Sequence, residues 1–68
     1  MPGTVARVTE LTAVSDTSFE DAIKTAVARA TQTLRGVRSA WVKEQKVMIS
    51  DGQITGYEVN LLVTFVLD

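Results

Sequence analysis

The chain has 68 residues, of which 46% are hydrophobic, and it contains neither cysteine nor histidine. This length allows one domain, spanning residues 1–68. The composition excludes a disulfide framework, thiolate metal sites and histidine-based catalytic pairs. A domain this small buries only about 60% of the surface of its unfolded chain, so it needs a further source of stability. Oligomerisation is the source that this composition favours.

The charge balance bears on the partners of the protein. Seven Lys and Arg residues against eight Asp and Glu residues give a net charge of −1, and the basic residues form no run. A nucleic-acid partner normally requires a basic patch, so we expect none. Apolar stretches such as 61–63 are far shorter than the roughly 20 residues of a membrane span. The first four residues show no signal peptide. We therefore predict a cytoplasmic protein without a membrane partner.

The first half of the chain indicates a strand followed by a helix. Residues 4–12 are rich in β-branched side chains, which predicts a strand. A polar run at 15–18 then marks a helix start, where Thr17 with Glu20 fits a capping box and Ser15 is a competing N-cap. Gly36 is expected to end the helix at its C′ position. Apolar residues form one helical stripe between these ends, at Phe19, Ala22, Ile23, Ala26, Val27, Ala30 and Leu34.

The second half indicates a β-hairpin. Strands are expected over 38–49 and 53–67, joined by the two-residue turn signal Asp51-Gly52. The last strand is the longest and most apolar, so it is expected at the centre of an antiparallel sheet. With this turn, four pairs of residues should face each other: Ala40 with Val63, Trp41 with Leu62, Val42 with Leu61, and Gln45 with Glu58.

Alternation along the last strand separates two faces. The apolar face should pack on the helix stripe and holds Tyr57, Val59, Leu61, Val63, Phe65 and Leu67, with Ala40 and Val42. The opposite face holds Glu58, Asn60, Leu62, Thr64 and Val66, with Ser39, Trp41, Lys43 and Gln45. That mixture is typical of a subunit interface or a ligand wall. The predicted class is α+β, in the order β-α-β-β, with one helix on one face of a three-stranded antiparallel sheet.

In this order and at this length, the segments resemble the dodecins. The matching stretches are Val8-Thr9-Glu10-Leu11, Ala22-Ile23, Ala28-Arg29-Ala30, Val42-Lys43-Glu44, Tyr57-Glu58-Val59 and Phe65-Val66-Leu67-Asp68. The resemblance implies a hollow homododecamer, in which twelve copies of the chain share small-molecule sites. It further implies a non-catalytic protein that binds and sequesters flavin between its subunits.

The resemblance also implies site residues. In flavin-binding dodecins a tryptophan of the second strand stacks on the isoalloxazine ring, and a glutamine of the last strand binds the ring edge. Ser39 stands at the position of that tryptophan, and Trp41 follows on the same face, about 7 Å along the strand. Glu58 stands at the glutamine position beside Gln45, and Lys46 matches a basic residue that reaches a phosphate. These five residues are the expected site for riboflavin or its phosphate, FMN.

Other interpretations stay open. Trp41 can pack at a subunit interface, Glu58 can form an interface ion pair, and Lys46 can be a solvated charge. The alternative function is a shell of the same kind that binds no flavin and holds calcium, another cation or another small ligand, with Glu44 and Glu58 as oxygen ligands. An enzymatic alternative uses Pro2 as an N-terminal general base after removal of Met1. We expect no catalysis, because the first strand is predicted to start beyond that proline.

Overall fold

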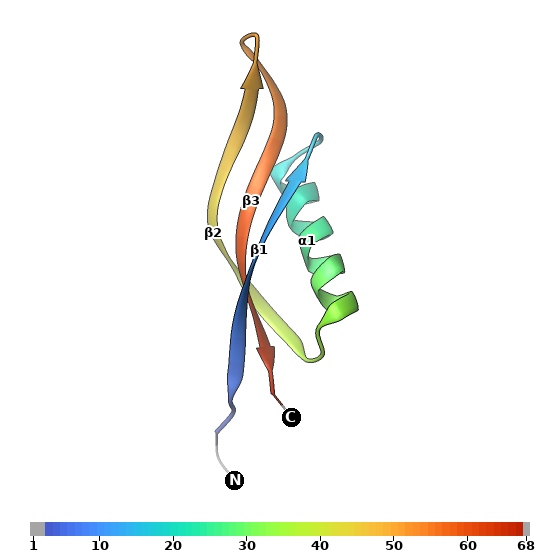
Figure 1. Ribbon diagram of the computed structural model, residues 1–68, viewed down its shortest axis with the longest axis vertical. Helices are drawn as coiled ribbons and strands as arrows, with labels where there is room; N and C mark the ends of the chain where they lie inside the picture. The colour runs from blue at the N-terminus through green and yellow to red at the C-terminus, as the bar shows by residue number, and fades with distance from the viewer. Residues whose placement is uncertain (1–2, 68) are drawn as a thin grey trace.

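The chain folds as one sheet and one helix. The computed structural model describes residues 3–67. The elements follow in the order β1 (Ala6–Ser15), α1 (Phe19–Thr33), β2 (Val37–Ser50) and β3 (Gln53–Val66). The sheet is antiparallel with the strand order β1-β3-β2, and α1 lies against one face (Figure 1). The predicted α+β, β-α-β-β fold with the last strand at the centre is confirmed.

The core lies between α1 and the sheet. Three alanines of α1 meet three apolar residues of β3, and all six are at most 5% exposed: Ala22, Ala26, Ala30, Val59, Leu61 and Val63. Alanines present little side chain, so the helix backbone can lie close to the sheet. At one end of this layer the rings of Phe19 and Tyr57 meet edge to face, with centroids 5.2 Å apart. The predicted helix stripe is therefore confirmed as the core side of α1, with the exception of Val27.

The helix is not centred on the sheet. It packs against β1 and β3 and makes few contacts with β2. Two residues that were predicted to join the core are consequently left at its margin, Val27 with 37% and Val42 with 46% of their surface exposed. The β2 side of the helix-covered face is thus only partly closed by its own chain.

The start of α1 corrects the sequence prediction. Ser18 is the N-cap, and its side chain accepts a hydrogen bond of 3.0 Å from the Asp21 N–H. The prediction that Thr17 with Glu20, or Ser15, caps the helix was wrong. Ser15 instead ends β1, which begins and ends later than the predicted strand 4–12. Its buried Oγ accepts from the Thr17 N–H at 2.9 Å and donates to Asp21 Oδ2 at 2.7 Å, so it ties the strand to the helix.

The connection from α1 to β2 depends on Gly36. The helix ends with Leu34 as C-cap, whose N–H donates to the Ala30 carbonyl. Gly36 therefore lies one residue beyond C′, and the prediction that it occupies C′ was wrong by one residue. Gly36 has a φ of 71°, and a Cβ atom there would lie 2.9 Å from the Val66 carbonyl oxygen. Its own carbonyl accepts from the Val66 N–H at 2.9 Å. Glycine lets the chain approach β3 closely at this point.

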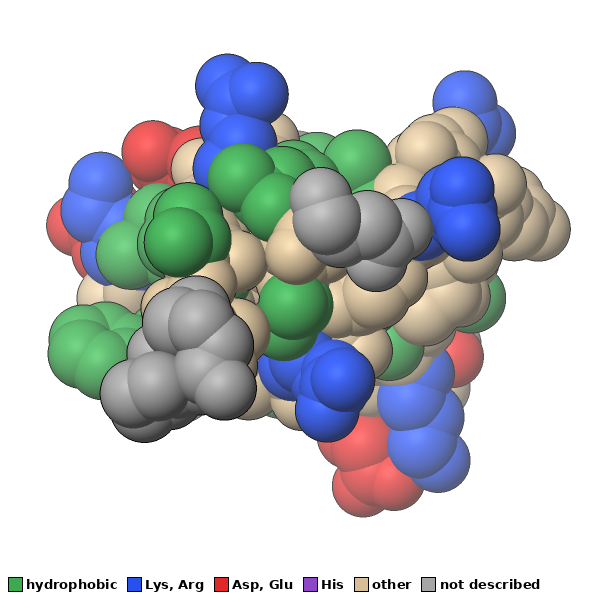
Figure 2. Space-filling model, turned by 90° about the horizontal axis from the view of Figure 1, so that it is seen from below, with side chains coloured by type: hydrophobic (Ala, Val, Ile, Leu, Met, Phe, Trp, Pro, Cys, Tyr) green, Lys and Arg blue, Asp and Glu red, His purple; other side chains and the backbone are tan. Residues whose placement is uncertain are grey.

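The β2–β3 hairpin closes through the predicted turn. Asp51 and Gly52 have φ values of 53° and 76°, and positive φ at both positions is the signature of a type I′ turn. The hairpin extends well beyond β1 and α1 at one end of the molecule, and both chain ends lie at the other (Figure 1). At that other end hydrophobic side chains reach the surface beside basic ones (Figure 2). No helix within residues 3–67 is long and apolar enough to cross a membrane.

The register of the hairpin is confirmed in part. Ala40, Trp41 and Val42 pair as predicted with Val63, Leu62 and Leu61. Gln45 pairs with Val59, whereas it was predicted opposite Glu58, and Glu58 pairs with Lys46. The cause is a pair of bulges: Thr55 is an extra residue of β3, which shifts the pairing by one position, and Lys43 is an extra residue of β2, which restores it. From Glu44 onward each side chain of β2 therefore lies on the opposite face from the one expected.

Candidate ligand site on the open sheet face

The face of the sheet turned away from α1 carries the candidate site, and we call it the open face. The register places on it Val8, Glu10, Thr12 and Val14 of β1, Ser39, Trp41, Glu44, Lys46 and Met48 of β2, and Glu58, Asn60, Leu62 and Thr64 of β3. Trp41, Val8 and Val14 expose 73%, 58% and 56% of their surface. One chain leaves this apolar surface uncovered, which is typical of an interaction site.

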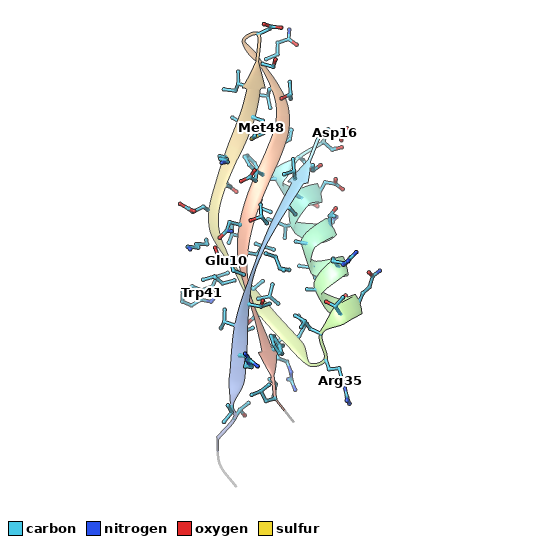
Figure 3. The ribbon with its side chains drawn as sticks, viewed as in Figure 1. Glu10, Asp16, Arg35, Trp41 and Met48 are labelled. Carbon is cyan, nitrogen blue, oxygen red and sulfur yellow. The ribbon has the colours of Figure 1, made fainter. Side chains whose placement is uncertain are left out.

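Trp41 stands beside a shallow apolar recess. The recess has a volume of about 190 Å³ and is lined by Val8, Trp41, Leu62 and Thr64. The indole points away from the sheet on the side opposite α1 (Figure 3). A flat aromatic ring with an apolar floor beside it offers a surface on which a planar heteroaromatic ligand can stack.

A second, polar recess lies further along the same face. It has a volume of about 230 Å³ and is lined by Glu44, Gln45, Lys46, Glu58 and Asn60. Lys46 Nζ lies 3.4 Å from Glu58 Oε2, so an ammonium group accompanies the carboxylate there. The structure therefore brings together the side chains of Lys46 and Glu58. Gln45 also borders the recess, but it pairs with Val59, so its side chain lies on the opposite face of the sheet.

Asn60 is a site residue that the sequence analysis did not single out. Its Nδ2 donates to Thr12 Oγ1 at 3.1 Å, and its Oδ1 is buried without a hydrogen-bond partner among residues 3–67. The available signal was its position, since an amide two residues after Glu58 had to lie on the same face. Only the three-dimensional structure shows that its carbonyl lacks a donor.

The bulge at Lys43 places a charged strip between the two recesses. Lys43 Nζ reaches across β3 to Glu10 Oε2 at 3.3 Å, so Lys43 and Glu44 lie on the same face although they are consecutive. Both partners of this ion pair are about half exposed, with side-chain exposures of 48% and 50%. Such a pair adds less than about 1 kcal/mol to stability, so its main effect is to set the charge pattern of the face.

Ser39 stands apart from both recesses. Its Cα partner is Thr64, and it borders a groove beside α1 together with Val37, Ala40 and Val63. Ser39 is two residues from Trp41 along β2, but it does not line the apolar recess. Its small hydroxyl side chain offers no ring to stack on a ligand.

The carboxylates of one protomer do not form a cation site by themselves. Among residues 3–67 no group of three or more acidic side chains lies close enough to hold a metal ion. Glu44 and Glu58 supply two carboxylates, and the amine of Lys46 accompanies one of them. The possible catalytic residue Pro2 lies outside the described residues.

Comparisons with known proteins show which family the chain belongs to. Small β-α-β-β proteins with a helix on one face of the sheet match the structure closely. The Dodecin family model matches residues 5–68, and the chain belongs to the dodecin family. A search of curated proteins gave no significant match.

Three solved structures illustrate the similarity. Dodecin from Streptomyces coelicolor is 35% identical, with a TM-score of 0.91 over 100% of this chain and 97% of that one. A single-residue variant of Thermus thermophilus dodecin is 38% identical, with a TM-score of 0.90 over 97% of this chain and 98% of that one. The calcium dodecin of Mycobacterium tuberculosis, described as calcium chelating with a novel calcium-binding site, is 33% identical, with a TM-score of 0.81 over 96% and 93% of the two chains.

Proposed function

We propose that this protein is a non-catalytic homododecamer that binds flavin, as riboflavin or FMN, between its subunits and so limits free flavin. The observation that carries the proposal is Trp41, whose indole is 73% exposed beside an apolar recess on the open face. An aromatic side chain exposed to this extent gains stability when a flat ring or a second copy covers it. Membership of the dodecin family supports both partners, the ligand and the further copies.

The other predicted residues have distinct roles in this proposal. Trp41 stacks on the isoalloxazine ring and quenches its excited state. Lys46, whose Nζ is held near Glu58, attracts the phosphate when the ligand is FMN. Glu58 lines the polar recess that takes the hydrophilic part of the ligand, and the backbone at Gln45 borders it. Ser39 comes two residues before Trp41 in β2 and is assigned to the edge of the stacked ring. The pair of recesses, one apolar and one polar, corresponds to the amphipathic character of a flavin.

A fluorescence titration with variants of Trp41 tests the stacking role. Ligand-stripped protein is added to dilute riboflavin, and separately to FMN, while the flavin emission is recorded. We expect saturable quenching with the wild-type protein, partial quenching with Trp41→Phe and none with Trp41→Ala. Full quenching by Trp41→Ala, from protein of unchanged molar mass, would remove Trp41 from the site.

The assembly is tested by sedimentation or light scattering. We expect one species with the mass of twelve subunits, because the open face of a lone chain leaves too much apolar surface in water. A monomer or dimer at working concentration would contradict the proposed shell. The same measurement checks that each variant keeps its assembly before its ligand binding is interpreted.

Cation binding is a second candidate function. The observation in its favour is that Glu44, Glu58 and the amide of Asn60 line one recess, so copies of the chain can combine their oxygen ligands around one ion. The similarity to a calcium dodecin points the same way. Calorimetric titration of calcium into the oligomer tests it: Glu44→Gln and Glu58→Gln should each abolish the binding heat. Unchanged heat in both variants would exclude this recess.

A further inference from the structure

The side-chain amide of Asn60 shows an unmet hydrogen-bonding requirement. Its Oδ1 has less than 1 Å² exposed and no partner among residues 3–67, whereas Nδ2 is paired with Thr12 Oγ1 at 3.1 Å. Nearly all buried polar atoms in folded proteins are paired, because burial removes the hydrogen bonds that water would supply. The unpaired carbonyl therefore marks a position where a donor from outside the chain is expected.

The position of Asn60 connects it to the proposed flavin site. Asn60 lies in β3 between two residues of the site. Leu62, two residues further on, is the Cα partner of Trp41, and Glu58, two residues earlier, is the partner of Lys46. Residues on one face of a strand are spaced by about 7 Å, which a fused three-ring system stacked on Trp41 can bridge. Asn60 also lines the polar recess, so it stands where the apolar part of the open face changes to the polar part.

The chemistry of the amide selects one group of the ligand. The polar edge of an isoalloxazine ring carries an imide N–H between two carbonyl groups, so it presents one donor flanked by acceptors. We propose that Asn60 Oδ1 accepts a hydrogen bond from this imide N–H, an assignment that rests on the proposed flavin function. Glu58 is another acceptor in the recess, but Lys46 Nζ already accompanies it at 3.4 Å. Asn60 thus recognises the unsubstituted imide edge.

The side chain opposite Asn60 allows the ligand to enter. Glu44 is the Cα partner of Asn60 in β2, and its side chain is exposed. Exposed long side chains change rotamer readily, so Glu44 can move aside as the ring edge approaches. The carbonyl of Asn60 itself stays oriented, because Nδ2 remains tied to Thr12 Oγ1.

A matched pair of ligands tests the assignment directly. Riboflavin is compared with N3-methylriboflavin, in which a methyl group replaces the imide hydrogen, by fluorescence titration of the wild-type oligomer. We expect the wild type to bind riboflavin about tenfold more tightly than N3-methylriboflavin. Asn60→Leu keeps a similar volume without the acceptor and should bind the two ligands with equal, weaker affinity. Thr12→Val, which removes the partner that orients the amide but leaves Oδ1, should weaken the preference without abolishing it.

The possible results separate this inference from the function on which it rests. Equal binding of both flavins by the wild type, or an undiminished preference in Asn60→Leu, overturns the role of Asn60 and leaves flavin binding intact. Failure of the wild type to bind either flavin overturns both. The comparison on the wild type needs no variant, so it decides the question even if Asn60→Leu does not assemble. We expect Asn60→Leu to be at least as stable as the ligand-free wild type, because it removes an unpaired buried acceptor.

Discussion

The two faces of the sheet differ although the same strand builds both. On the side of α1, Val59, Leu61 and Val63 of β3 are at most 1% exposed and touch only apolar neighbours in the core. On the open face, Trp41 is 73% and Val8 58% exposed. A chain of this size can close one face with its single helix, and the second face is left for other molecules. The first face holds the buried core that stabilises the fold, and the second is the face to which we assign ligand binding in our proposal.

The open face also differs in its charge pattern. Two ion pairs, Glu10 with Lys43 and Lys46 with Glu58, lie among its apolar side chains. A purely apolar face would associate without specificity, whereas fixed charges penalise wrong arrangements of the partner. The charges thus restrict what covers this face to partners that complement them.

The largest effect is expected from the closed face. Leu61→Ala should lower the free energy of unfolding by about 2–5 kcal/mol, because it leaves a cavity where the side chain is fully buried. Leu62→Ala, its neighbour on the open face, is the matched control and should cost clearly less in ligand-free protein. Denaturant unfolding at one fixed protein concentration measures both. Equal losses would mean that the two faces are packed equally well.

The next effect concerns the connection that holds α1 on its face. Gly36→Ala should destabilise by about 2 kcal/mol, since it combines a left-handed φ with a close approach of the new Cβ to the Val66 carbonyl. Gly52→Ala is the control, because its φ is also positive but nothing lies within 4 Å of the added atom. Thermal unfolding should rank Gly36→Ala as the less stable variant. The reverse order would contradict the close contact.

A smaller effect is expected at the start of α1. Ser18→Ala should cost about 1 kcal/mol, the usual value of an N-cap, because the Asp21 N–H loses its acceptor. Thr17→Ala should change stability very little, since its exposed hydroxyl only donates to Asp16 Oδ1. Denaturant midpoints of the two variants compare them. A larger loss in Thr17→Ala would restore the capping box predicted from the sequence.

The smallest effect is expected from the polar recess. Glu58→Gln should raise the affinity for riboflavin by less than about tenfold, because an amide can donate to the ring carbonyls whereas an ionised carboxylate cannot. The ion pair lost with Lys46, which is largely exposed, contributes at most about 1 kcal/mol. Glu44→Gln serves as the control and should leave the riboflavin affinity unchanged. Weaker flavin binding by Glu58→Gln would show that the carboxylate is used as it stands.

Much of the fold could be predicted from the sequence because its signals are local. Apolar periodicity gave the helix stripe, and Asp51-Gly52 gave the hairpin turn. The pairing of Trp41 with Leu62 was predicted from the turn alone, and it is correct because two irregularities cancel. Lys43 is an extra residue in β2 and Thr55 is an extra residue in β3, so only the segment between them is shifted by one position.

The site could be predicted less completely, because part of it lies in the shifted segment of the β2–β3 hairpin. The extra residue Thr55 moves Gln45 out of the pair with Glu58 and puts Lys46 there, and the bulge at Lys43 ends the shift. No local propensity marks either position as a bulge. The choice of Ser18 as N-cap also depends on where β1 ends, since Ser15 and Thr17 have suitable side chains too. The unpaired carbonyl of Asn60 results from packing of three strands, which the sequence does not specify directly.

The central claim is that a flavin stacks on the open face at Trp41, and the fluorescence of that residue tests it most directly. Trp41 is the single tryptophan of the chain, so the tryptophan lifetime of the oligomer reports this one position. The lifetime is recorded while riboflavin is added to ligand-stripped protein. We predict a saturable shortening of the lifetime that follows the loss of flavin emission. An unchanged tryptophan lifetime while flavin binds would place the ligand away from the open face and contradict the account.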